Sequence, residues 1–142
     1  MQYKGMLASL APEVIKVSLE RQTNADVAEF MRKSFVYGMR QGGRLCLDIA
    51  TSKPDFTAMN TESTFNADQF FNVEYMKVRE NYMPFVRDED CKDVGGISGG
   101  FYTRIDGFTL IIRSSAANQE ELLQQIALIP NFNSEFNHAV IE

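Results

Sequence analysis

The segment Arg44–Ala50 (RLCLDIA) constrains the fold more strongly than any other part of this sequence. It is apolar on both faces as far as Asp48, a pattern that is typical of a buried strand in a parallel sheet. Residues 23–43, just before it, have a capping threonine and asparagine at their start, apolar side chains at helical spacing, and two closing glycines. A helix that leads into a buried strand predicts an α/β chain.

Further segments extend this pattern. Residues 14–19 (VIKVSL) are rich in β-branched side chains, and Ile15, Val17 and Leu19 alternate, which predicts a first strand. A second helix is expected after Asn66. Two alternating apolar runs on either side of Asp106-Gly107 predict a β-hairpin, the second run being the third main strand, residues 108–112. A last helix is expected from about Asn118 to Pro130.

The expected fold is therefore α/β, with a small, mainly parallel sheet, flanking helices and one β-hairpin. Residues 1–142 are expected to form a single α/β domain, with residues 1–13 as an N-terminal arm and residues 133–142 as a C-terminal tail. The expected core sheet has three strands, fewer than the usual four to six. An open position in so narrow a sheet indicates that a partner covers it.

Composition excludes several classes of function. The 142 residues carry a net charge of −5, and 44% are hydrophobic, including 11 phenylalanines. A folded core is therefore expected, without the basic face that binding to nucleic acid or anionic lipid requires. No stretch approaches the ~18 apolar residues of a membrane span. Cys46 and Cys91 form neither a disulfide framework nor a zinc pattern, which favours a reducing, cytoplasmic location and no metal or cofactor.

Other candidate features have a structural interpretation that we favour. His138 has no nearby nucleophile, the acidic triplet at residues 88–90 is typical of a solvated loop, and the glycine-rich residues 95–100 lead into the expected hairpin and not into a helix. Aromatic side chains cluster at helical spacing, which is more typical of a core than of a binding surface. The members of this cluster are Phe65, Phe70, Phe71, Tyr75 and Tyr82. Because few charges accompany Phe70 and Phe71, they are also candidates for a partner interface.

The order of these segments resembles the degenerate AAA-type P-loop modules of the dynein heavy chain and of related axonemal ATPase-like proteins. The resemblance covers about two thirds of the chain. It rests on five segments in order, VIKVSL, VAEFMRKSFVYGMRQGG, RLCLDIA, FTLIIRSS and ALIPNFN. It implies a P-loop-NTPase-like fold, but the sequence GxxxxGK[ST] that cradles phosphates is absent. The residues before the expected first strand are too few for that loop and its helix.

The resemblance also implies roles for particular residues. Asp48 would be the Walker-B-like carboxylate, but Ile49 stands where the catalytic glutamate is expected. Ser114 would take the polar sensor position, and Arg104 or Arg113 could face a phosphate. Since the phosphate loop and the catalytic base are both missing, we do not expect an active enzyme.

The sequence thus favours a non-catalytic structural or interaction subunit, a relic of an AAA-type module that packs against a protein partner. The resemblance implies a larger cytoskeletal or axonemal assembly, with a cytoplasmic, cytoskeletal or ciliary location. Loss of the P-loop strand would expose one edge of residues 108–112, so Phe108, Leu110 and Ile112, with Phe70 and Phe71, are the expected interface. The alternative is a nucleotide-binding or hydrolysing domain with an atypical or partner-supplied phosphate loop, in which Asp48 and Ser114 line the site.

Overall fold

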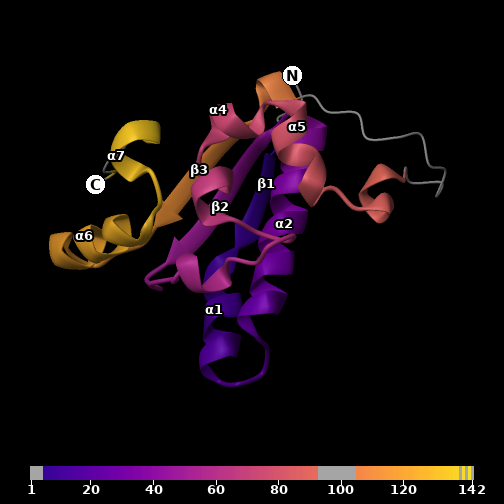
Figure 1. Cartoon of the computed structure of the whole chain (residues 1–142). Helices are drawn as coiled ribbons and strands as arrows, with labels where there is room; N and C mark the ends of the chain where they lie inside the picture. Colours follow the sequence, from indigo (N-terminus) through magenta and orange to yellow (C-terminus); the bar gives the residue numbers. More distant parts are fainter. Residues whose placement is uncertain (1–4, 93–104, 138, 140, 142) are drawn as a thin grey trace.

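A three-stranded parallel sheet forms the centre of the molecule (Figure 1). The computed structural model describes residues 5–92, 105–137, 139 and 141. The strands β1 (Gly5–Ser9), β2 (Arg44–Ala50) and β3 (Thr109–Ser114) lie in the order β1-β2-β3. The mixed α/β class and the mainly parallel sheet are therefore confirmed. In the described residues β2 is the central strand, and β1 and β3 are the edges.

The described helices differ widely in length. Two helices, α1 (Leu10–Ser18) and α2 (Asn24–Gln41), connect β1 to β2. Short helices follow β2, namely η1 (Thr57–Met59), α3 (Ala67–Phe70), α4 (Val73–Met76), α5 (Arg79–Tyr82), η2 (Met83–Phe85), η3 (Asp88–Cys91) and η4 (Ile105–Gly107). After β3 come α6 (Gln119–Leu128) and α7 (Phe132–Glu135). The hairpin of α1 and α2 projects beyond one end of the sheet (Figure 1).

The prediction of α2 and β2 from the sequence is confirmed. The hydroxyl of Thr23 accepts a hydrogen bond from the backbone N–H of Asp26 at 3.3 Å, and the Asp26 carboxylate accepts one from the Thr23 N–H at 2.7 Å. This reciprocal capping box satisfies two backbone donors at the start of α2. At the other end Gly42 adopts φ of 62°, the left-handed conformation that ends helices and suits glycine.

The predicted strand at residues 14–19 is wrong. Most of these residues belong to α1, and the first strand is β1, inside the predicted N-terminal arm. Leu10, Val14 and Val17 lie on one helical face and pack into the core, whereas Ile15 is exposed. The apolar residues of this short run fit both a period of 2 and a period of 3.6, so periodicity alone did not separate strand from helix.

Two other expected elements also differ. The helix expected after Asn66 is divided into α3, α4 and α5, because the side chain of Asn72 caps a new helix by accepting from the N–H of Tyr75 at 3.0 Å. The Asp106-Gly107 turn of the predicted hairpin lies in η4, and β3 pairs in parallel with β2. The partner strand of that hairpin falls mostly on residues 101–104, outside the described residues.

The C-terminal predictions are largely confirmed. The side chain of Asn118 caps α6 by accepting from the Glu121 N–H at 2.9 Å. The third main strand begins one residue later than predicted and continues to Ser114. The predicted tail at residues 133–142 begins inside α7.

One face of the sheet carries the core. Leu45, Leu47 and Ile49 of β2 point to this face and are buried together with Leu110 of β3. The core is dominated by phenylalanine rings from α2, from the short helices and from the segments around them, with Phe35–Phe70 and Phe70–Phe85 centroid distances of 4.9 and 4.7 Å. On the side shown in Figure 1 the short helices pass in front of β2.

Candidate interaction surface and the predicted nucleotide site

The second face of the sheet presents a row of apolar side chains that the described residues leave partly exposed. The parallel register places Leu7, Cys46 and Ile111 side by side across the three strands. Leu7 is 58% exposed and Ile111 is 41% exposed, while Cys46 is half-buried between its neighbours. Parallel sheets are normally covered on both faces. An exposed apolar row on such a sheet is therefore a candidate docking surface.

Polar side chains lie on both sides of this row. Alternation along the strands adds Arg44 and Thr109 at the amino end of the face, and Ser9, Asp48 and Arg113 at the carboxyl end. We call this surface the open face, and its members are Leu7, Ser9, Arg44, Cys46, Asp48, Thr109, Ile111 and Arg113. Burial raises the pKa of the Cys46 thiol, and the nearby Asp48 carboxylate raises it further. Cys46 thus stays a neutral thiol that packs as a small apolar group.

Asp48 has a structural role at the end of β2. One carboxylate oxygen accepts a hydrogen bond from the backbone N–H of Ala50 at 3.0 Å, and the other lies 3.6 Å from the guanidinium of Arg113. Ala50 has a positive φ of 48°, and the register between β2 and β3 is irregular at this point. The Asp48 side chain therefore stabilises the strained turn that ends β2.

Ser114 also has local partners, but on the other side of the sheet. Its hydroxyl contacts the side-chain oxygen of Gln125 and accepts a hydrogen bond from the Ala116 N–H at 3.0 Å. Gln125 is only 2% exposed and donates to the carbonyl groups of Ala50 and Ser52 at 3.0 and 2.7 Å. This buried network ties α6 to the carboxyl ends of β2 and β3.

The two residues of the predicted nucleotide site do not converge. Arg113 is paired with Asp48 in the register, so these two side chains share one face of the sheet. The side chain of Ser114, the next residue along β3, therefore points to the opposite face. Each side chain is held by its own set of hydrogen bonds. Arg104, the other arginine considered for a phosphate contact, lies outside the described residues, as do residues 95–100.

Most of the predicted interface residues lie in the core. Phe70 and Phe71 are fully buried, and Phe108 and Leu110 are almost so. Ile112 is half-buried and packs against the same core. The even-numbered side chains of β3 point inward, so the exposed apolar residue of this strand is Ile111, which the sequence interpretation did not select. Of the aromatic cluster, Phe65 and Tyr82 are also buried, whereas Tyr75 is partly exposed.

A buried, ion-paired arginine is a feature of the structure that the sequence interpretation missed. Arg32 of α2 has no exposed surface. Its guanidinium donates to the carboxylate of Glu29 at 2.8 and 2.9 Å, to Asp90 at 2.7 Å and to the Phe85 carbonyl at 2.9 Å. Hydrogen bonds from Arg32 hold the pKa of Glu29 below its usual range. The same bonds raise the pKa of Arg32, so its charge is permanent.

This network fixes the acidic segment that was expected to be solvated. Asp90 also accepts a hydrogen bond from the backbone N–H of Arg87 at 2.7 Å, and Arg40 donates to the carbonyls of Asp90 and Lys92. Because each buried side-chain nitrogen and oxygen in it has a hydrogen-bond partner, the cluster acts as a structural clamp between α2 and η3. The Glu29–Arg32 spacing was visible in the sequence, but the contact with Asp90, 58 residues away, was not.

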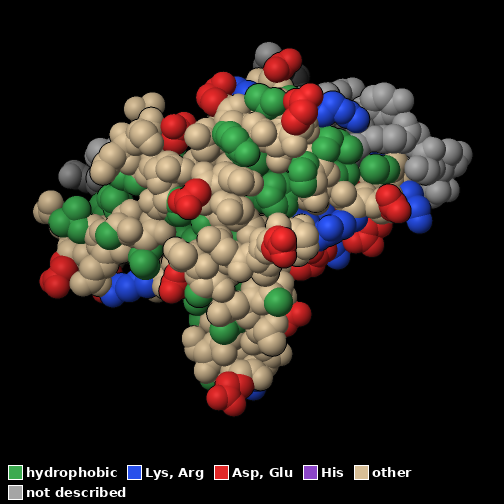
Figure 2. Space-filling model, in the orientation of Figure 1, with side chains coloured by type: hydrophobic (Ala, Val, Ile, Leu, Met, Phe, Trp, Pro, Cys, Tyr) green, Lys and Arg blue, Asp and Glu red, His purple; other side chains and the backbone are tan. Residues whose placement is uncertain are grey.

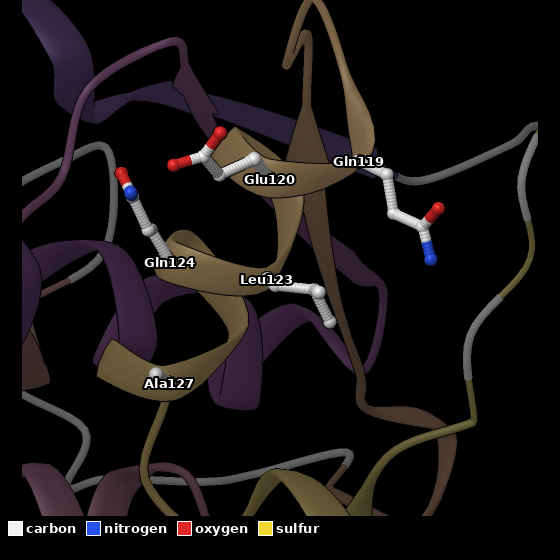
Figure 3. Close-up of a pocket in the computed structure, with 5 residues that line it drawn as sticks. All are labelled: Gln119, Glu120, Leu123, Gln124 and Ala127. Atoms are coloured by element: carbon white, nitrogen blue, oxygen red, sulfur yellow. The ribbon is translucent and has the colours of Figure 1, made fainter.

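Other kinds of site find little support in the described parts of the chain. Within them, no group of three or more His, Cys, Asp and Glu side chains could hold a metal ion, and no helix is both long and apolar enough to cross a membrane. A hollow lies on the outer side of α6 and is lined by Gln119, Glu120, Leu123, Gln124 and Ala127 (Figure 3). All five belong to one helix and do not converge on a common point. On the face shown in Figure 2, acidic and basic side chains are interspersed.

Comparisons with protein-family models, with curated proteins and with solved structures find no match to this chain.

Proposed function

We propose that this chain is a non-catalytic structural or interaction subunit that packs against a protein partner through the open face. The observation that carries the proposal is the register row of Leu7, Cys46 and Ile111 on the face of a parallel sheet that the described residues leave partly exposed. Leaving these side chains in water forgoes roughly 25 cal/mol for each Å² of apolar surface that a partner could bury. A second protein chain is the natural cover for such a face.

The origin of the chain as a relic of an AAA-type module is part of the same proposal. A parallel α/β sheet supports it. The direct connection from β1 to α1 also fits a module that has lost its phosphate loop. Ser9 ends the strand and Leu10 begins the helix, so no residues between them could form such a loop. The weakest part of the resemblance is its first segment, VIKVSL, which is helical and not a strand. On this proposal the subunit works in the cytoplasm, in a cytoskeletal or axonemal assembly.

The alternative, a nucleotide-binding or hydrolysing domain, has less support. Asp48 and Ser114 leave opposite faces of the sheet and are engaged in separate structural contacts. If nucleotide bound at Asp48, saturating magnesium-ATP would raise the thermal midpoint by several degrees, and Asp48→Ala would remove that shift. We expect no shift for the unmodified chain.

Site-specific photocrosslinking tests the proposed surface. A photoreactive amino acid replaces Ile111 on the open face or, as a control, Leu123 on α6, which is 56% exposed. The chain is expressed in the cells that naturally produce it and is then irradiated. We expect a discrete protein adduct from position 111 and none from position 123. Adducts at neither position, or the same adducts at both, would contradict docking through the open face.

A further inference from the structure

We draw no further inference here: the strongest candidate, the apolar row of Leu7, Cys46 and Ile111 on the open face of the sheet, belongs to the surface already proposed for docking, and nothing in the described residues shows what covers it.

Discussion

At the scale of single residues, Arg32 shows how a charge can be buried in this molecule. The guanidinium has no exposed surface, yet each of its polar contacts is made within the protein by Glu29, Asp90 and the Phe85 carbonyl. Burial of an ion is costly, and the pairing offsets that cost only while all partners are present. Removal of one charged side chain from the clamp should therefore lower the stability of the fold strongly, because it leaves another buried charge without a partner.

Removal of the guanidinium should be strongly destabilising. We expect Arg32→Ala to lower the free energy of unfolding by about 3–5 kcal/mol, because a buried pair loses one partner and a cavity forms. Lys33→Ala, at the exposed neighbouring position, should change it by less than about 0.5 kcal/mol. Urea unfolding monitored by circular dichroism measures both values. A loss below about 1 kcal/mol for Arg32→Ala would show that the clamp does not hold α2 to η3.

The same clamp makes stability depend on pH in a defined direction. Arg32 depresses the pKa of Glu29 in the folded state, so the folded protein binds that proton less readily than the unfolded chain does. The contribution is therefore fully present above the ordinary glutamate pKa and is lost as the pH falls through the lower folded value. Glu13 and Asp26 have lowered pKa values from their own hydrogen bonds and act in the same direction.

We accordingly expect the urea midpoint to fall as the pH is lowered from about 5 to about 3. Glu29→Gln should flatten part of this decline, because the variant has no proton to gain at that position. An unchanged pH profile in Glu29→Gln would show that this carboxylate does not link folding to pH.

At the scale of elements, the sequence was most informative where several local signals agree. For α2 the capping box, the helical spacing and the closing glycines all indicate the same helix, and β2 follows from its apolar run. For α1 the signals conflict: β-branched residues favour a strand, while the spacing of Leu10, Val14 and Val17 fits a helix. Tertiary packing decided between them, and packing is not visible in a single short segment.

Most of the residues predicted for the interface lie in the core for a related reason. Placing residues 108–112 in a strand was nearly right, but the sequence did not show which alternate set of side chains points inward. Leu110 is buried and Ile111 is exposed, a difference that depends on where α2 and the short helices lie. Asp48 and Ser114 likewise were placed correctly at strand ends, but the two opposite faces that they occupy follow only from the register.

A pair of substitutions in α1 separates the helix from the strand that the sequence suggested. In the helix Val17 packs against the core and Ile15 is exposed, whereas alternation in a strand would put both on one face. We expect Val17→Asp to cost about 1–3 kcal/mol and Ile15→Asp less than about 0.5 kcal/mol. Equal losses for the two variants in urea unfolding would contradict the helical assignment.

At the scale of the whole molecule, the unusual property is a parallel sheet of which the described residues cover one face more fully than the other. Helix α2, the short helices and a cluster of phenylalanine rings fill the core side, while Leu7 and Ile111 remain exposed on the other. Parallel sheets seldom persist with an uncovered face, because their connections usually place helices on both sides. The proposed function follows from this asymmetry, and it does not require the chain to do chemistry.

The most direct test is nuclear magnetic resonance of the methyl-labelled chain with a soluble paramagnetic agent. In a dilute sample we predict strong broadening of the Leu7 and Ile111 methyl signals, while those of Leu45 and Leu47 on the core face stay sharp. With a bound partner, Leu7 and Ile111 should become protected. If Leu7 and Ile111 were as protected as Leu47 in the dilute monomer, the sheet would be covered on both faces and the central claim would be wrong.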